Sequence, residues 1–173
     1  MITVANNILS TLTVLGQIGI LVLLTSRLIK KNLPGVEFIK SRTLVFSFIV
    51  ALAAALGSLF YSQIAGYEPC ALCWYQRIFL YPQVFILGLA LIKKDFSVAP
   101  YIQLLSAIGA IIAGYQHLLQ LGWVPSLVCT AVGGVSCAQR FVMGFGYITL
   151  PLMSFTAFLL LIIITSFIKN KSK

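Results

Sequence analysis

Long apolar stretches alternate with short polar ones along the whole chain, and this alternation is the dominant pattern in the sequence. About 20 apolar residues are enough to cross a hydrocarbon core of ~30 Å. Five stretches come close to this length or exceed it: Ile8–Ile29, Thr43–Ala65, Trp74–Ile92, Tyr101–Leu119 and Tyr147–Ile168. Because a segment in lipid must satisfy its own backbone hydrogen bonds, each stretch is predicted to be an α-helix. The pattern therefore predicts an all-α membrane protein.

The amino-acid composition indicates the same class. Of the 173 residues, 60% are hydrophobic and 9% are charged, whereas a soluble domain carries about 25% charged residues. The net charge of +9 does not indicate nucleic-acid binding, because the basic residues flank the apolar stretches and form no stripe with interleaved aromatics. We therefore expect membrane lipid, and no nucleic acid, around the protein.

The basic residues also predict how the chain is oriented. All lysines and arginines except Arg77 and Arg140 lie in the first connection, the third connection or the C-terminal tail. The positive-inside rule places these segments in the cytoplasm. The first apolar stretch has neither a basic leader nor a small-residue cleavage site, so it is expected to remain as a spanning helix. The N-terminus is thus predicted outside, the C-terminus in the cytoplasm and all cysteines on the outer side.

The connection from Lys30 to Arg42, which contains Pro34-Gly35, is the predicted domain boundary. Residues 1–38 would form an extra N-terminal transmembrane helix with a cytoplasmic linker. Residues 39–173 would form a four-transmembrane-helix bundle that holds every cysteine. The predicted fold is therefore a four-helix bundle plus one extra N-terminal transmembrane helix.

Cys70 and Cys73 form a C-x-x-C motif immediately before the third apolar stretch, and Arg77 follows one helical turn later. The positive end of a helix and a nearby guanidinium both favour a reactive thiolate. The pair can therefore act in redox chemistry, form a structural disulfide or supply half of a zinc site. Zinc is disfavoured because seven residues separate Cys129 from Cys137, so the usual second C-x-x-C is absent.

Arg77 is expected to lie at the outer edge of the bilayer. An ionisable side chain at that depth usually has a function. One explanation is that its guanidinium donates hydrogen bonds to a membrane-soluble electron acceptor, such as a quinone carbonyl. The other is that it extends to the lipid headgroups. The residues alone leave both open.

The connection from Gln120 to Gly146 is the longest in the chain and contains Cys129 and Cys137. A connection of this length is more often functional than idle. Residues 137–143 are predicted to form a short helix on the membrane surface, with Phe141, Val142 and Phe145 turned towards lipid.

The cysteine motif and its surroundings resemble the bacterial disulfide bond formation protein B (DsbB) family, especially its short-loop, BdbC-like branch. The resemblance covers roughly Thr43 to Ile168. It rests on four segments: Pro69-Cys70-Ala71-Leu72-Cys73-Trp74-Tyr75-Gln76-Arg77, Tyr115-Gln116-His117, Cys129, and Cys137-Ala138-Gln139-Arg140.

The resemblance implies a quinone-dependent thiol oxidoreductase of the bacterial plasma membrane. Such a protein would reoxidise a DsbA-like thioredoxin-fold partner outside the cytoplasm. It would pass the electrons to ubiquinone or menaquinone and so support disulfide bond formation.

The resemblance also implies a role for each cysteine. A Cys129–Cys137 disulfide would oxidise the partner, with Cys129 as the sulfur attacked. Cys137 would then exchange with Cys70, and Cys73 would pass electrons to a quinone near Arg77.

His117 matches the family's residue near the quinone site. Considered alone, a single histidine at a helix end is more often a hydrogen-bonded structural residue. Both interpretations stay open at this point.

Two features depart from the better-known members of the family. Those members place many more residues than seven between the two loop cysteines, and they have no counterpart of Ile8–Ile29. The seven-residue spacing leaves the order of the exchange steps open, and the extra helix is expected to be an anchor or a lateral packing helix.

Two other functions remain as alternatives. A vitamin K epoxide reductase-like quinone reductase is disfavoured because its loop cysteines precede the C-x-x-C, whereas Cys129 and Cys137 follow it. A non-enzymatic membrane scaffold with disulfide-stapled outer loops leaves the position of Arg77 beside Cys73 unexplained.

Overall fold

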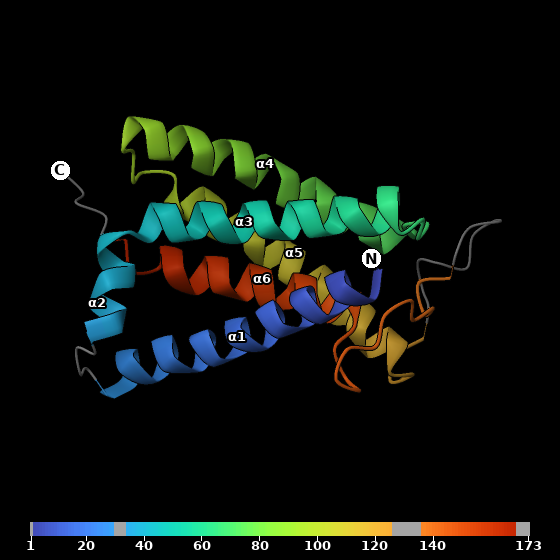
Figure 1. Ribbon diagram of the computed structural model, residues 1–173. Coiled ribbons are helices and arrows are strands. Elements are labelled where there is room, and N and C mark those ends of the chain that lie inside the picture. Colours follow the sequence, from blue (N-terminus) through green and yellow to red (C-terminus); the bar gives the residue numbers. More distant parts are fainter. Residues whose placement is uncertain (1, 30–33, 126–135, 169–173) are drawn as a thin grey trace.

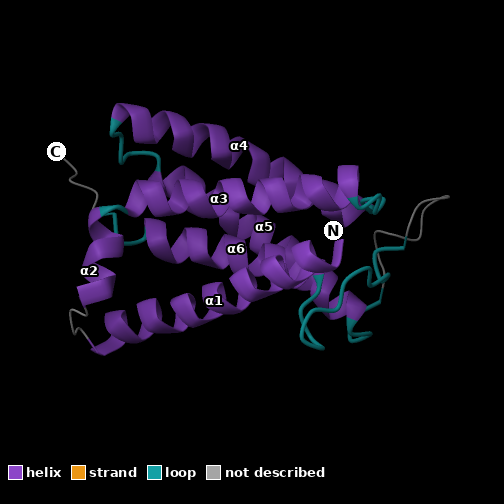
Figure 2. Ribbon diagram, viewed as in Figure 1, coloured by secondary structure: helices purple, strands orange, loops and turns teal. Residues whose placement is uncertain are grey.

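The computed structural model of the protein describes residues 2–29, 34–125 and 136–168. The described residues form helices and contain no β-strand, so the predicted all-α class is confirmed (Figure 2). In chain order the elements are α1 (Ile2–Ile29), α2 (Pro34–Ser41), α3 (Thr43–Leu59), the π-helical turn η1 (Phe60–Ile64), α4 (Ala71–Lys93), α5 (Ala99–Gln120) and α6 (Leu150–Thr165).

The long helices lie side by side in one bundle, and the short helix α2 joins α1 to α3 at one end (Figure 1). Helix α6 is the most central, because it contacts α5, α3 and α1. Helix α4 packs against α3 and α5. Helix α1 packs along α6 on the outside of the bundle formed by α3 to α6. This is the predicted four-helix bundle with one extra N-terminal helix.

The helices have the length and composition of membrane-spanning segments. Helices α1, α4, α5, and α3 continued by η1, are long and apolar enough to cross a bilayer. Helix α6 is also apolar but has 16 residues, which is about 24 Å at ~1.5 Å per residue. The chain is thus a multi-pass membrane protein.

The two ends of the bundle differ in chemistry. Arg27, Arg42 and Lys93 lie at the end of the bundle where α1, α4 and α6 end and α3 begins. The loop before α4, which carries Cys70, lies at the other end together with the N-terminus and the loop before α6 (Figure 1). The separation of basic residues from cysteines agrees with the sequence analysis. Which end faces the cytoplasm stays a prediction.

Three local expectations differ from the structure. Helix α4 begins at Ala71, three residues earlier than predicted, so Cys73 lies inside its first turn. Part of the predicted linker is the helix α2, whose Phe38 packs edge-on against Phe46 of α3 with ring centroids 5.8 Å apart. Helix α6 begins at Leu150 and not at Tyr147.

The predicted surface helix over residues 137–143 is wrong, because this segment has one turn at 137–138 and is otherwise irregular. Of the three side chains expected at lipid, Phe145 is exposed, whereas Phe141 and Val142 face inwards. Val142 is buried, and the ring of Phe141 stacks on Tyr67 with centroids 4.9 Å apart. Contacts with the end of the bundle therefore outweigh the amphipathic pattern of the segment.

Small residues on α5 allow α6 to approach closely, as helix packing in membranes commonly requires. Ala110 and Ala113 are buried, and the fully buried ring of Phe158 lies directly over Gly109. Phe155 lies against Gly114 at an ordinary van der Waals distance, about 3.4 Å from the place of a Cβ atom. The two glycines thus differ in how much room they leave.

This difference predicts that Gly109→Ala destabilises the protein more than Gly114→Ala. A methyl group at position 109 would overlap the ring of Phe158, and overpacking of this kind typically costs ~1–3 kcal/mol. Both variants gain the same helix propensity, so their comparison isolates the overlap. Thermal unfolding of the purified protein in detergent measures the effect. Equal midpoints for the two variants would contradict the packing described here.

Candidate redox site

Cys70 and Cys73 are positioned by the start of α4. Cys70 is the residue before the helix, with an extended backbone (φ −69°, ψ 171°), and its carbonyl accepts the first helical hydrogen bond from the Trp74 N–H at 3.1 Å. Cys73 lies in the first turn, which brings the two Sγ atoms to 3.0 Å from each other. Both are free thiols. The positive end of the helix acts on both sulfurs.

The two thiols have different environments. Cys70 is 6% exposed, whereas Cys73 is only partly buried. The hydrogen bond with Cys73, and then burial, raise the pKa of the Cys70 thiol. Cys70 therefore holds the shared proton. Cys73 is left as the sulfur that accepts hydrogen bonds, which is the role of the nucleophilic member of a pair.

A buried amide pair from two helices is hydrogen-bonded to the sulfurs. Nε2 of Gln116, on α5, lies 3.1 Å from Cys70 Sγ and 3.4 Å from Cys73 Sγ. Nε2 of Gln76, on α4, donates to Oε1 of Gln116 at 2.6 Å. Because its oxygen is occupied by Gln76, the Gln116 amide presents its N–H groups to the cysteines. Donors in this position stabilise negative charge on sulfur.

Sequence reasoning missed Gln76 and Gln116 as functional residues, although both stand inside the segments that carry the family resemblance. Each one precedes a residue that was selected, Arg77 and His117 respectively. Helical periodicity cannot show which of two neighbouring polar residues faces a distant cysteine. That assignment requires the packing of α5 against α4.

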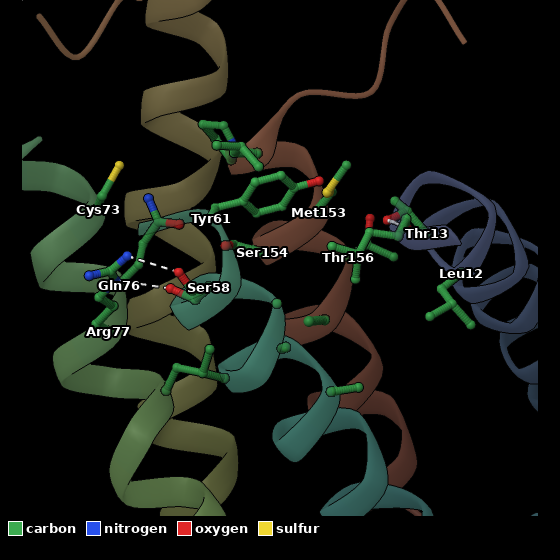
Figure 3. Close-up of a pocket in the computed structure, with 18 of the residues that line it drawn as sticks. Leu12, Thr13, Ser58, Tyr61, Cys73, Gln76, Arg77, Met153, Ser154 and Thr156 are labelled. Atoms are coloured by element: carbon green, nitrogen blue, oxygen red, sulfur yellow. Dashed lines mark hydrogen bonds between the residues drawn. The ribbon is translucent and has the colours of Figure 1, made fainter. Parts of the chain in front are cut away.

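Arg77 is buried between α3 and α4, with 8% of its surface exposed. Its Nε donates to Ser58 Oγ at 2.9 Å, and one of its terminal nitrogens donates to the Ser58 carbonyl at 3.1 Å (Figure 3). The guanidinium also lies 5.2 Å from the centre of the Trp74 ring. The side chain is fixed within the bundle, so extension towards the headgroups does not describe it.

A π-helical turn follows the serine that holds Arg77. Helix α3 gives way to η1 at Phe60, two residues after Ser58. Such single-turn departures from α-helical geometry occur frequently at functional sites. Here the turn leads into the loop that carries Tyr67 and Cys70.

A cavity of about 290 Å³ opens beside Cys73 and Arg77 (Figure 3). Gln76, Gln116 and Ser58 contribute polar atoms to the same wall. The remaining walls are mainly apolar and come from α3, α6 and α1. Ligand pockets typically measure ~300–1,000 Å³ and combine apolar walls with a few polar groups. The cavity is at the small end of that range and suits a flat ring with polar oxygens and an apolar substituent.

A stack of three aromatic rings lines the cavity at the cysteine end of the bundle. Tyr61 and Tyr67 are parallel with centroids 5.9 Å apart, and Phe141 stacks on the other face of Tyr67. Phe141 belongs to the segment that carries Cys137. The loop before α6 is therefore part of the cavity wall.

Cys137 lies against the C-x-x-C motif. It is 1% exposed and disulfide-bonded, and it shares one cluster of buried side chains with Cys70, Leu72 and Leu119. Cys129, its partner in the predicted pairing, lies outside the described residues. The structure thus brings three of the four predicted cysteines together.

Two polar residues after Cys137 attach its loop to the end of α5. The guanidinium of Arg140 donates twice to the carbonyl of Gln120, from Nε at 2.8 Å and from a terminal nitrogen. The side chain of Gln120 in turn donates to the carbonyl of Gln139 at 2.9 Å. A cation at the C-terminus of a helix is favourable because carbonyls are unpaired there. The contacts explain why Gln139 and Arg140 accompany Cys137 in the motif.

His117 is not beside Arg77. Its Nδ1 lies 3.1 Å from Oγ1 of Thr149, the residue that precedes α6. It is absent from the described lining of the cavity. The predicted role of His117 near a quinone therefore stays a prediction, and the contact seen here joins α5 to the start of α6.

The chain is similar to known proteins of disulfide formation. The model of the family described as "Disulfide bond formation protein DsbB" matches residues 40–168. The SPbeta prophage-derived disulfide bond formation protein B of Bacillus subtilis (strain 168) is 46% identical over 125 residues, which are 72% of this chain and 83% of that protein. Disulfide bond formation protein C of the same organism is 42% identical over 125 residues, or 72% and 91% of the two chains. No solved structure matches the chain.

The family match includes the cysteines, Gln76, Arg77, Gln116 and His117, but it begins after α1. Residue 40 lies near the end of α2, and the matched part continues to residue 168, the last described residue. The relatives are covered over most of their own length, by 83% and 91% in the two cases above. Helix α1 therefore lies outside the bundle that the family model covers.

Replacing Gln116 with Met is expected to slow the reaction of reduced Cys73 with an alkylating reagent. A hydrogen bond to a charged group contributes ~1.5–3 kcal/mol, so the loss of the amide donors predicts a decrease of about tenfold or more in rate at neutral pH. Alkylation followed by mass spectrometry, with Cys129 and Cys137 kept as a disulfide, measures that rate.

The matched control is Gln83→Met. Gln83, on α4, is also a fully buried amide; its Oε1 accepts from Ser106 Oγ at 2.9 Å and its Nε2 donates to the Phe79 carbonyl at 2.8 Å, so this variant also breaks buried hydrogen bonds. It lies away from the sulfurs and is expected to leave the alkylation rate unchanged. An equal decrease in both variants would mean that general loosening, and not the amide contact, controls the reactivity.

Proposed function

Because the chain belongs to the DsbB family of disulfide bond formation proteins, we propose that it is a membrane thiol oxidase that draws electrons from a reduced partner and delivers them to a quinone. The partner would be a DsbA-like thioredoxin-fold protein outside the cytoplasm. The electron acceptor would be ubiquinone or menaquinone. The observation that carries the proposal is that Cys73 and Arg77 line one cavity while Cys137 and Cys70 belong to one cluster of buried side chains.

The first step is exchange with the partner. A partner thiolate attacks Sγ of Cys129, which breaks the Cys129–Cys137 bond and releases Cys137 as a thiolate. The second partner thiol then displaces Cys129, so the partner leaves with a disulfide and this chain retains two thiols. The step needs a disulfide at Cys137, and Cys137 is disulfide-bonded. Thiol–disulfide exchange through a mixed disulfide is the general chemistry of such pairs.

The second step moves the electrons inside the protein. With Cys70 and Cys73 joined as a disulfide, the Cys137 thiolate attacks Cys70 and releases Cys73 as a thiolate. Cys129 then displaces Cys70, which restores the Cys129–Cys137 disulfide and leaves a reduced Cys70–Cys73 pair. The shared cluster of Cys70 and Cys137 supports this order.

The third step uses the arrangement around Cys73. The amide of Gln116 stabilises charge on the sulfur, Cys70 holds the proton, and Arg77 is placed to donate a hydrogen bond to an acceptor in the cavity. A quinone bound there supplies the oxidising power by taking up two electrons and two protons. Cys70 and Cys73 then form a disulfide again, for which the sulfurs must approach by about 1 Å from their present 3.0 Å.

The proposed topology follows the charge distribution. The basic end of the bundle would face the cytoplasm and the cysteine end would face outwards, where a thioredoxin-fold partner has access. A scaffold function accounts less well for the site, because disulfide staples need neither a buried arginine nor an amide aimed at two free thiols. The vitamin K epoxide reductase-like alternative is disfavoured because its loop cysteines precede the C-x-x-C, whereas Cys129 and Cys137 follow it.

The proposal predicts quinone reduction that depends on the cysteines. Purified protein is mixed with a reduced C-x-x-C thioredoxin-fold protein and a soluble ubiquinone analogue, and quinol formation is followed by absorbance. Wild-type protein should turn over, while Cys73→Ser and Cys129→Ser should each reduce the rate to background. Undiminished turnover in both variants would refute the relay.

Arg77→Lys is expected to raise the KM for quinone by about tenfold or more, because a hydrogen bond to a charged group contributes ~1.5–3 kcal/mol and Lys cannot reproduce the guanidinium fork. The KM for the thioredoxin-fold partner should stay the same. Arg27→Lys is the matched control, because Arg27 also donates to a serine, Ser166 at 2.6 Å, and lies over an aromatic ring. That site is at the other end of the bundle. A KM change for the partner alone would show that the quinone is placed wrongly.

A further inference from the structure

Helix α1 forms part of the cavity that contains Arg77. Three of its residues, Leu9, Leu12 and Thr13, are among those that line the cavity. Arg77 and Leu12 stand on opposite sides of the cavity in Figure 3, with Tyr61 between them. A helix outside the bundle that the family model covers thus supplies one wall of the proposed quinone site.

The position of α1 is fixed by contacts along its length. Near its middle, the hydroxyl of Tyr147 donates to Oε1 of Gln17 at 3.0 Å. At its C-terminal end, Arg27 donates to Ser166. Gly16 lets α6 come close, since a Cβ atom there would lie 3.0 Å from Leu160 Cδ1. These contacts indicate a docked helix and not a loosely attached anchor.

The cavity changes in character from one side to the other. Beside α4, its wall carries the polar side chains of Gln76 and Arg77 together with the thiol of Cys73. Towards α1 the lining is mostly apolar, with Leu9 and Leu12 on α1 and Leu160 on α6. Thr13 and Thr156 also line this side, but their hydroxyls donate to carbonyls of their own helices. A molecule with a polar ring at one end and a hydrocarbon chain at the other matches this gradient.

We infer that α1 is the wall on which the isoprenoid tail of the quinone rests. The inference depends on the proposed function, which places the quinone ring beside Cys73 and Arg77. A ring held there must send its tail out of the cavity, and the apolar lining leads to Leu9 and Leu12. Helix α1 therefore determines how well long-tailed quinones bind, while the ring contacts belong to the bundle that the family model covers.

Photolabelling of the full-length protein in lipid nanodiscs tests the inference without relying on turnover. The probe is a ubiquinone analogue with a diazirine in its isoprenoid tail, and the labelled peptides are identified by mass spectrometry. We expect saturable labelling of residues 9–13 that an excess of unlabelled ubiquinone removes. If unlabelled ubiquinone removes labelling only from α3, α4 and α6, and none of the labelling on α1, the inference is overturned while the quinone site remains supported. No competed labelling anywhere would refute the proposed function as well.

A pair of substitutions on α1 provides the second measurement. Leu12 and Leu15 are similarly exposed, at 50% and 57%, but only Leu12 lines the cavity. Leu12→Trp therefore adds bulk at the cavity, and Leu15→Trp makes the same change away from it. Leu12→Trp should raise the KM for a long-tailed quinone several-fold and leave the KM for a tail-less analogue unchanged. Leu15→Trp should change neither. Equal effects of Leu12→Trp on both quinones, or equal effects of the two variants, would overturn the inference.

Discussion

Polar side chains inside the bundle gain stability from hydrogen-bond partners in the protein, because lipid offers none. This constraint decides which helices are neighbours. The guanidinium of Arg77 joins α4 to α3 through Ser58, and Ser106 joins α5 to α4 by donating to Gln83. Gln17 holds α1 against the segment before α6. Apolar packing alone discriminates poorly between neighbours in a membrane, since lipid tails are as apolar as leucine.

The same constraint shapes the redox centre. An isolated pair of buried thiols would have few partners in an apolar environment, and the amide of Gln116 supplies them. Gln76 fixes the direction of that amide, so the two sulfurs receive donors and the shared proton stays with Cys70. Satisfying the hydrogen bonds of a buried cluster and preparing a thiolate for electron transfer are therefore achieved by one arrangement.

The loop before α6 connects the two halves of the site. Its Cys137 shares a buried cluster with Cys70, and four residues later its Phe141 stacks on Tyr67 at the cavity. Arg140 attaches the segment between them to the end of α5. A short and anchored piece of chain therefore joins the disulfide at Cys137 to the cavity wall.

The sequence by itself determined the fold class and the number and order of the long helices, and it selected three cysteines that the structure brings into one cluster. It did so because hydrophobic length and the spacing of cysteines are local properties, read directly along the chain. The start of α4 was misplaced by three residues, since Ala71 and Leu72 continue a helix whose first turn also contains Cys73. The difference is small, but it places Cys73 inside the helix and not before it.

Only the tertiary structure decided which side chains meet. The role of Gln116 depends on its approach to sulfurs 43 and 46 residues away in the chain, and no periodicity encodes such a contact. The same holds for Phe141, which the amphipathic pattern assigned to lipid, and for Leu12 of α1, which reaches a cavity built by the other helices. The physical reason is that a buried polar atom or a cavity wall is satisfied by whichever neighbour the packing brings near, and packing is a property of the whole bundle.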